Sequence, residues 1–385
     1  MDNFSFQMST KYVFGKDSHK KIGELLKPYA DKVLLVYGGG SIKRNGLYAD
    51  VVESLTANGV AFVELSGVQA NPRYEKVLEG IDLVKKENLK LVLAVGGGSV
   101  IDTSKAIAMS LGADDVWSCF TGAAKLTDAL PVATILTIPA AGSEVSPDAV
   151  ISYKGRKLGF SSQKIRPVVS VVNPDIFITL PKNQIANGVC DMMSHIFERY
   201  FTQTQHTDLI DSLAESTLKT IMRNALLLMQ NPADYNAWCE VSLGGSFAHN
   251  GFLGCGRIQD WGCHAMEHEL SAQDEKVAHG AGLAVLTPAW MRYVYKENPK
   301  MFYQFAVNVM DVKADRDEEK VILAGIAKLA CFFQSLGQPS SLRELGFTEN
   351  SPLEEMAKKC TGDRYVGNFK PLYWNDVLNI YKACL

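Results

Sequence analysis

The stretch that indicates the fold most directly is Leu89-Lys-Leu-Val-Leu-Ala-Val-Gly-Gly-Gly-Ser-Val-Ile-Asp102. An apolar, valine-containing run stops at three glycines, and a serine then opens a helix-like apolar pattern. This order predicts a strand, a tight loop and a helix. The same order begins at Asp31-Lys-Val-Leu-Leu-Val-Tyr-Gly-Gly-Gly-Ser41, so the unit occurs twice in the first half of the chain.

The loop formed by Gly96, Gly97, Gly98 and Ser99 is a candidate phosphate site. Glycines let the backbone approach a pyrophosphate, and the helix that follows supplies N–H donors and a partial positive charge. The alternative is a tight turn between strand and helix, because Gly-Gly-Gly-Ser is neither G-x-G-x-x-G nor a P-loop. The motif alone leaves both interpretations open.

Further strands are expected at residues 60–65, 132–138 and 168–172. The helical stretches between them predict a parallel, doubly wound sheet. Ligands of such sheets bind beyond the carboxyl ends of the strands. Both glycine triplets and Thr137-Ile-Pro-Ala-Ala-Gly-Ser-Glu144 lie at such ends, so we expect them to converge on one ligand.

The character of the sequence changes after about Leu180. Long apolar-periodic segments replace the β-branched runs, which predicts helices at 209–229, 237–252, 320–337 and 375–383. A chain of 385 residues is also too long for one ordinary core. We expect an α/β domain at residues 1–180 and an α-helical domain at residues 181–385.

The second half carries a candidate metal site. Asp191 and His195 are spaced D-x3-H in a predicted helix, so carboxylate and imidazole share one face and can close on a single ion. His264 and His268 have the same spacing, and His279 follows them. Each histidine alone could be an ordinary one satisfied by hydrogen bonds. Together, the two pairs and the acid favour a metal.

The ligand types limit the metal without naming it. Three imidazoles and a carboxylate suit Fe(II), Zn(II), Mn(II) or Co(II). His268 exceeds what a four-ligand site needs, which leaves it available for proton chemistry. Cys190 and Cys263 adjoin ligands in sequence but point about 100° away on a helix, so we expect them to pack in the core.

The composition excludes several classes of protein. A net charge of −3 with interspersed signs provides no basic stripe, so nucleic acid is not an expected partner. The N-terminus lacks a signal-peptide pattern and no apolar run approaches membrane length, so we expect a cytoplasmic protein without a membrane partner. The eight cysteines include no C-x-x-C, as expected of reduced thiols.

These motifs, in this order, resemble the iron-containing alcohol dehydrogenase family. The likeness is carried by G-G-G-S-V-I-D-T-S-K (96–105), P-A-A-G-S-E (139–144), D-x3-H (191–195), H-x3-H (264–268) and the H-G-A-G-L that begins at His279. V-Y-G-G-G-S-I-K-R-N-G (36–46) and V-Q-A-N-P-R (68–73) are similar to the butanol dehydrogenase branch. The resemblance implies a dehydroquinate synthase-like fold, with an α/β dinucleotide-binding domain followed by an all-α domain.

The resemblance also implies an activity, which is hydride transfer between nicotinamide C4 and a small primary alcohol or aldehyde. By position it implies that Asp191, His195, His264 and His279 bind a divalent metal, Fe²⁺ first and Zn²⁺ as the alternative, and that His268 is a catalytic residue near the nicotinamide. The cofactor contacts that it implies are Gly38, Gly39, Gly40, Ser41, Asn71, Gly96, Gly97, Gly98, Ser99, Asp102, Thr137 and Lys157. Two other functions remain open: a metal-dependent lyase of the same fold, and a non-catalytic protein that binds nucleotide and metal.

The turn at the end of the second nucleotide-binding strand bears on the choice of cofactor. An acid there would bind the ribose 2′-hydroxyl of NAD(H) and repel the 2′-phosphate of NADP(H). The loop instead reads Gly38-Gly39-Gly40-Ser41, with Lys43 and Arg44 close behind. We expect NADP(H) to be preferred, with NAD(H) as the alternative. The resemblance further implies a homodimer that pairs through a strand around residues 11–14.

Overall fold

A six-stranded sheet organises the first half of the chain in the computed structural model, which describes residues 1–385. All its neighbouring strands are parallel, in the order β1-β8-β5-β4-β2-β3. The strands are β1 (Lys11–Phe14), β2 (Lys32–Tyr37), β3 (Ala61–Leu65), β4 (Val92–Gly96), β5 (Val132–Leu136) and β8 (Val169–Val172). The expected parallel sheet is confirmed, although the strand expected at 132–138 ends at Leu136.

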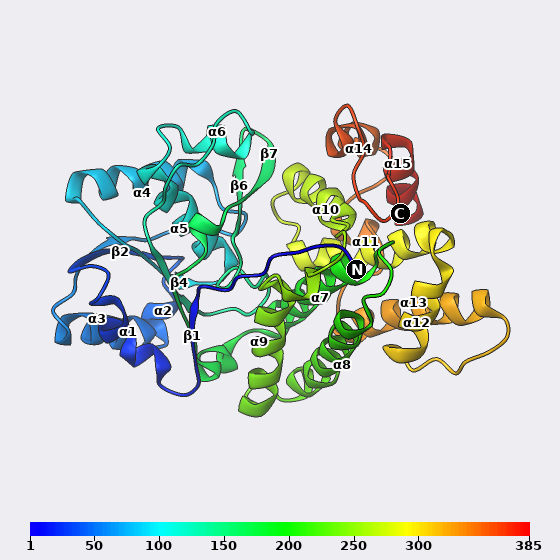
Figure 1. The fold of residues 1–385 in the computed structure, drawn as a ribbon, viewed down its shortest axis with the longest axis horizontal. Helices are drawn as coiled ribbons and strands as arrows, with labels where there is room; N and C mark the ends of the chain where they lie inside the picture. Colours follow the sequence, from blue (N-terminus) through cyan, green and yellow to red (C-terminus); the bar gives the residue numbers. More distant parts are fainter. The chain divides into compact units, whose positions relative to one another are not determined.

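Helices cover both faces of this sheet, as Figure 1 shows for the blue-to-cyan part of the chain. On one face lie α1 (Ile22–Leu26) and α3 (Leu47–Ala57), whose Leu26 and Leu55 pack on Leu35 and Leu93 of the sheet. On the other lie α4 (Tyr74–Glu87) and α5 (Gly98–Ala108). Two short helices, α2 (Ser41–Arg44) and α6 (Val116–Phe120), complete this half.

The sheet has a topological switch point between β2 and β4. From β2 the chain runs outward to β3, and then returns to form β4 on the opposite side of β2. Connections that leave in opposite directions open a crevice at the carboxyl ends of the two strands, where ligands of such folds bind. Both glycine triplets follow these two strands.

An antiparallel hairpin was not expected from the sequence. It consists of β6 (Asp148–Tyr153) and β7 (Arg156–Ser161), and it pairs Ser152 with Lys157. In β6 the buried residues Ala149 and Ile151 alternate with partly exposed ones, but Val150 between them is also apolar, and β7 has no buried residue, so the sequence carries no strong strand pattern.

The second half is all helical, as expected. Its helices are α7 (Lys182–Tyr200), α8 (Asp208–Gln230), α9 (Tyr235–His249), α10 (Gly262–Gln273), α11 (His279–Val294), α12 (Pro299–Asn308), α13 (Glu318–Ser335), α14 (Leu353–Thr361) and α15 (Trp374–Ala383). The helix expected at 237–252 ends at His249, and α12 and α14 were not expected. Helix α7 is the central one, because it is packed by α8, α9 and α11 and is buried almost throughout from Ile185 onward.

The chain divides into two compact units. One comprises Gln7–Thr179, and the other comprises Leu180–Leu385 together with Met1–Phe6. The N-terminal segment is attached to the helical unit by a backbone hydrogen bond from Asp2 to Gly256 and by an edge-to-face contact between Phe6 and Phe252. None of the helices combines the length and the apolar character needed to cross a membrane.

Candidate metal and cofactor sites

Helix α7 carries three ionisable side chains on one buried face. Asp191, His195 and Glu198 are spaced i, i+4 and i+7, and their exposed fractions are 5%, 6% and 3%. Charged groups at this depth are costly unless they are paired or bind an ion. Helix α7 by itself therefore places these three side chains in one site. The other side chains of the site must come from other helices.

Three histidines converge on the carboxylate of Asp191. Its Oδ1 lies 3.6 Å from His195 Nδ1 and 3.8 Å from Nε2 of both His264 and His279. These separations are too long for hydrogen bonds. They are close to the ~3.4 Å that separates the ligand atoms of a tetrahedral ion with bonds of about 2.1 Å. The four predicted ligands are thus brought together from α7, α10 and α11.

Unpaired polar atoms mark the centre of this cluster. Asp191 Oδ1, His195 Nδ1 and His264 Nε2 are buried and have no hydrogen-bond partner. An unsatisfied buried polar atom costs about 1–3 kcal/mol, so three together need a physical reason. A divalent cation held at their common focus would satisfy all three, and the residues present therefore fit such an ion.

Two glutamates orient the histidine rings. His264 Nδ1 lies 3.0 Å from Glu198 Oε1, and His279 Nδ1 contacts Glu267 Oε2. An ionised carboxylate only accepts hydrogen bonds, so both Nδ1 atoms carry a proton, and Nε2 of each ring is the atom that can bind an ion beside Asp191. Histidines that bind metals are held in this way. In the sequence these glutamates are marked only by their position, one helical turn from a predicted ligand.

The protonation of the cluster is consistent with a metal site. Burial lowers the pKa of His195 well below its usual range, so this ring is neutral and can donate a lone pair. Burial also acts to lower the pKa of His264, but Asp191 and Glu198 together raise it to about 9. In the absence of an ion His264 is thus protonated, and binding a cation would release that proton.

His268 lies beside the cluster. It is on α10 one turn beyond His264, and its ring centroid is 5.6 Å from that of His279. It is partly exposed, whereas His264 is buried. Ligand atoms of His268, His279 and Glu267 also lie within 4.8 Å of one another. His268 is therefore close enough to act on a group held near His279.

A further layer of residues, also without a role in the sequence analysis, supports His195. The ring of His249 lies 4.1 Å from that of His195, and Arg199 donates a 3.0 Å hydrogen bond to His249 Nδ1. The Arg199 guanidinium also lies 4.6 Å from the ring of Trp261. Trp261 has φ 71°, a left-handed conformation that is rare for an aromatic residue, and its N–H donates to Glu198 at 2.6 Å.

The two cysteines beside the ligands are core residues, as expected. Cys190 and Cys263 are 0% and 3% exposed. Burial raises the pKa of both thiols well above the usual range. They are therefore neutral at physiological pH, in keeping with a packing role.

The predicted cofactor residues gather at one edge of the parallel sheet. Gly38, Gly39 and Gly40 follow β2, Asn71 follows β3, Gly96 ends β4, Gly98 and Ser99 open α5, and Thr137 follows β5. Hydrogen bonds join these loops, from the Thr137 N–H to the Gly96 carbonyl at 3.0 Å and from the Gly67 N–H to the Gly38 carbonyl at 3.1 Å. Lys157 lies apart from them on β7 of the hairpin.

The glycines of the two triplets differ in how much space a side chain would have. A Cβ at Gly96 would lie 2.4 Å from the Val100 side chain, so this glycine is required by packing. A Cβ at Gly39 would meet nothing within 4 Å, so this position borders open space. Gly97 is the N-cap of α5; the Val100 N–H bonds its carbonyl at 3.0 Å, and the N–H groups of Gly98 and Ser99, in the first turn, have no partner within the helix. The loop thus combines a tight turn with an available set of N–H donors that fits a phosphate.

Asp102 supports a neighbouring segment of the same edge. Its Oδ1 accepts a hydrogen bond from Ser143 Oγ at 2.6 Å, and its Oδ2 accepts one from the Val150 N–H at 3.0 Å. Both carboxylate oxygens therefore already bind protein atoms. The resemblance, which implies a cofactor contact for Asp102, does not predict this arrangement.

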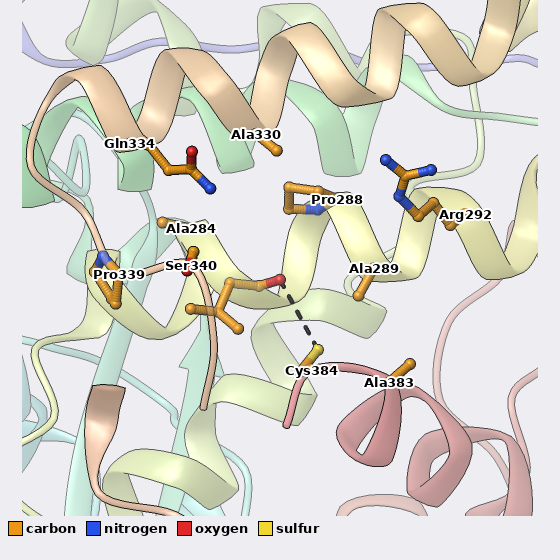
Figure 2. Close-up of a pocket in the computed structure, with 11 residues that line it drawn as sticks. Ala284, Pro288, Ala289, Arg292, Ala330, Gln334, Pro339, Ser340, Ala383 and Cys384 are labelled. Carbon is orange, nitrogen blue, oxygen red and sulfur yellow. Dashed lines mark hydrogen bonds between the residues drawn. The ribbon is translucent and has the colours of Figure 1, made fainter. Parts of the chain in front are cut away.

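A cavity of about 170 Å³ lies elsewhere in the helical unit, as Figure 2 shows. It is lined by α11, α13 and the C-terminus, with Pro288, Gln334 and Cys384 among its residues. Pro288 interrupts the hydrogen bonding of α11 at this point, because proline has no N–H. None of the predicted site residues lines this cavity.

The comparisons with known proteins point to one family. Residues 9–174 match the family model described as iron-containing alcohol dehydrogenase. Residues 185–385 match the model of the C-terminal part of the Fe-containing alcohol dehydrogenase family. NADH-dependent butanol dehydrogenase A of Clostridium acetobutylicum is 42% identical over 99% of both chains. NADPH-dependent aldehyde reductase YqhD of Escherichia coli is 34% identical over 93% of both chains.

A solved structure has the same fold. The crystal structure of NADH-dependent butanol dehydrogenase A from Thermotoga maritima superposes with a TM-score of 0.95 at 39% sequence identity. The match covers 100% of this chain and 99% of that one. The likeness therefore extends over both halves of the molecule.

Proposed function

The chain belongs to the iron-containing alcohol dehydrogenase family, in its butanol dehydrogenase branch, and from this membership we infer that it is a metal-dependent alcohol dehydrogenase or aldehyde reductase. Its proposed reaction is the interconversion of a small primary alcohol and its aldehyde with NAD(P)(H). The observation that carries the proposal is the convergence of three imidazole nitrogens on Asp191 Oδ1 at 3.6–3.8 Å.

We propose that Asp191, His195, His264 and His279 hold the metal. One carboxylate and three neutral imidazoles leave a divalent ion with a net charge of +1, which favours an electron-rich oxygen as a further ligand. When bound, the ion supplies a Lewis acid that lowers the pKa of an alcohol and polarises a carbonyl. Fe²⁺ is the proposed working metal, and Zn²⁺ binds a donor set of this kind as well.

The residues of the chain have separate tasks in this reaction. Glu198 and Glu267 hold the ring nitrogens of two ligands so that their lone pairs face the ion. The loops at residues 38–41, 71, 96–99 and 137 bind the dinucleotide, with its pyrophosphate at the first amides of α5. When bound, the cofactor supplies the hydride acceptor or donor at nicotinamide C4. Lys157 adds a positive charge on the hairpin.

His268 is the proposed proton-transfer residue. It lies one turn from His264 and near His279, so its imidazole can accept the alcohol proton or pass it to solvent. Its other possible role is to orient a ligand. His268→Gln separates the two: metal content near the wild-type value, a lower kcat and a flatter pH profile support proton transfer. Metal loss like that of His264→Ala assigns it to the ligand set instead.

NADP(H) is the proposed preferred cofactor, because Gly39 offers no acid to repel a 2′-phosphate and Lys43 lies nearby. Relatives with either preference occur in the family. The butanol dehydrogenases at about 40% identity are named NADH-dependent, and the 34% identical aldehyde reductase is named NADPH-dependent. The ratio of kcat/KM for NADPH and NADH measures the preference directly.

The test of the overall proposal is turnover of butanal with NADPH or NADH after reconstitution with Fe(II) or Zn(II). Asp191→Ala and His264→Ala should lose metal and activity together, at least about tenfold, while nucleotide still binds. Product formed from a substrate without net oxidation of NAD(P)H would indicate a lyase. Metal and nucleotide binding without any turnover would indicate a non-catalytic protein.

Three further features are part of the proposal. The functional domains are residues 1–180, which bind the dinucleotide, and residues 181–385, which bind the metal. The protein is a homodimer in the cytoplasm. It uses no nucleic acid or membrane partner.

A further inference from the structure

Lys105 is fully buried in α5, two turns after the glycine-rich loop. Its Nζ donates hydrogen bonds to three backbone carbonyls, those of Ser143 at 2.7 Å, Ser146 at 3.0 Å and Asp148 at 2.6 Å. An ammonium group has three hydrogens, enough to donate one to each carbonyl, and Ser143 Oγ also lies 2.9 Å from Nζ. All three lie about forty residues further along the chain, in the segment between β5 and β6.

The charge of Lys105 is retained at neutral pH. Burial lowers its pKa to about 8, and the nearby carboxylates of Asp102, Asp148 and Glu144 oppose this effect, whereas Arg166 adds to it. The group is therefore mostly an ammonium at pH 7, the form that donates three hydrogen bonds. Burying a charge costs free energy unless the charged group is hydrogen-bonded. The three carbonyl oxygens supply those hydrogen bonds to Lys105.

Other buried side chains hold the same segment. Between the carbonyls bound by Lys105, that of Glu144 accepts from Ser170 Oγ and that of Val145 accepts from the Arg166 guanidinium. Four consecutive carbonyls, from Ser143 to Ser146, are thus bound by side chains from α5, β8 and the segment before β8. Buried backbone carbonyls need hydrogen-bond partners, and in this stretch distant side chains supply them.

Asp102, one turn before Lys105, binds the first residue of this segment and also strand β6, which follows it. Its hydrogen bonds to Ser143 Oγ and to the Val150 N–H join α5 to β6. Two residues later, the Ser152 N–H donates to the Pro72 carbonyl at 2.8 Å, next to Asn71. Because β6 pairs with β7, the position of Lys157 depends on these contacts.

We propose that Lys105 is a positioning residue for cofactor binding. It holds residues 143–148 and the β6–β7 hairpin against α5, so that the Asn71 loop, the glycine-rich loop and Lys157 have one fixed arrangement before the cofactor binds. Such preorganisation removes an ordering cost from the binding step. The inference rests on the proposed function, because it assumes that these loops bind NAD(P)(H). Lys105 itself contacts no substrate or cofactor.

The variant Lys105→Met in the metal-loaded full chain tests the proposal. We expect the Kd and KM for NADPH to rise roughly tenfold or more, which corresponds to about 1.4 kcal/mol. The KM for butanal and the metal content should stay near the wild-type values. Hydrogen–deuterium exchange should become faster at the Val150 and Ser152 amides, and remain unchanged in β4.

Ser104→Ala is the matched control. Ser104 is buried in the same helix, but its hydroxyl bonds only the Val100 carbonyl of that helix at 2.8 Å. It should leave NADPH binding and the exchange of residues 143–158 unchanged. If Lys105→Met does not fold, Ser143→Ala takes its place, since it removes the 2.9 Å contact to Lys105 and the 2.6 Å contact to Asp102 while keeping the backbone. For this variant we expect a rise of roughly two- to fivefold in the Kd for NADPH.

The outcomes are distinct. Folded Lys105→Met or Ser143→Ala protein with the wild-type Kd for NADPH, or with unchanged exchange at Val150 and Ser152, would overturn the proposal. A purely structural lysine would lower the unfolding midpoint and leave the Kd of the folded protein unchanged. Failure of the wild-type protein to bind either dinucleotide would instead reject the proposed function, and the exchange measurement would still report on the role of Lys105.

Discussion

Glu198 shows how much of the metal site depends on residues that are not ligands. Its Oε1 accepts bonds from both the backbone N–H of His264 at 2.9 Å and the ring Nδ1 of the same residue at 3.0 Å. Its Oε2 accepts the Trp261 N–H. One carboxylate thus sets the start of α10 and the orientation of its first ligand, and Glu267 does the same for the ring of His279.

Glu198→Gln should lower metal affinity about 10- to 100-fold, because the amide cannot accept at both ends and His264 loses its fixed tautomer. Titration with a competing chelator measures this directly. The control is Glu215→Gln, since Glu215 accepts bonds from Tyr200 and Gln304 and touches no histidine. Wild-type affinity in Glu198→Gln would remove the glutamate from the metal site.

Gly39→Asp should shift the cofactor preference toward NAD(H). A Cβ at Gly39 meets nothing within 4 Å, and the residue has no left-handed backbone, so an aspartate can be built without strain. Its carboxylate would bind a ribose 2′-hydroxyl and repel a 2′-phosphate. We expect the NADPH/NADH ratio of kcat/KM to fall at least about tenfold.

Asn45→Asp is the control for Gly39→Asp, because it adds the same charge just beyond the neighbouring short helix. Its ratio should stay close to that of the wild type. A wild-type enzyme that already uses NADH as well as NADPH would contradict the proposed preference.

At the scale of elements, helix α11 approaches α7 and α10 closely, and this approach assembles the metal site. A Cβ at Gly280 would lie 2.1 Å from the Asn187 carbonyl oxygen, so the first turn of α11 nearly touches the backbone of α7. A Cβ at Gly282 would lie 2.8 Å from Glu267 of α10. These two glycines let α11 begin next to both helices, and His279, its first residue, thereby reaches Asp191.

Gly280→Ala should therefore disturb the metal site without changing a ligand. The added methyl group has to displace α11 from α7, which costs about 1–3 kcal/mol of stability, and the displacement carries His279 away from Asp191. We expect a lower melting temperature and weaker metal binding. Ala289→Ser, in the same helix but half exposed, should change neither. If Gly280→Ala retained full metal affinity, the close approach would not determine the position of His279.

At the scale of the whole molecule, β1 leaves one edge of the sheet open. β1 pairs only with β8, through the amides of Lys11 and Gly15. Alternate amides of a strand point in opposite directions, so the N–H of Phe14 points away from β8. An open edge of this kind favours pairing with a second copy.

We expect the protein to sediment with a mass near 84 kDa, twice the 42.2 kDa of one chain. Phe14→Pro removes the outward N–H and spares the bonds to β8, so it should favour the monomer. Tyr29→Ser, an exposed aromatic residue of the same half, is the control. A wild-type monomer at micromolar concentration would reject the homodimer, and a Phe14→Pro dimer would place its interface elsewhere.

The features that could be predicted from the sequence are those whose cause is local. The two strand–glycine–helix units have a pattern that can be read within about fourteen residues, and the parallel sheet follows from their repetition. The i, i+4 spacing likewise places Asp191 with His195, because a helix has the same geometry wherever it packs. Spacing by itself also pairs His264 with His268, and it was the resemblance to the family that implied the set Asp191, His195, His264 and His279, which lie together in the structure.

The remaining features depend on packing between distant segments. Glu198 and His264 are 66 residues apart, and Lys105 and Asp148 are 43 apart, so no spacing rule relates them. The hairpin β6–β7 was not predicted because apolar Val150 obscures the alternation of β6 and because β7 has no buried residue. The hairpin is held by contacts to α5 and to the Pro72 carbonyl. A buried charge can be recognised as a ligand support or a loop anchor only when its partners are known. Those partners are set by how the helices and strands pack, since that packing decides which buried polar groups must satisfy one another.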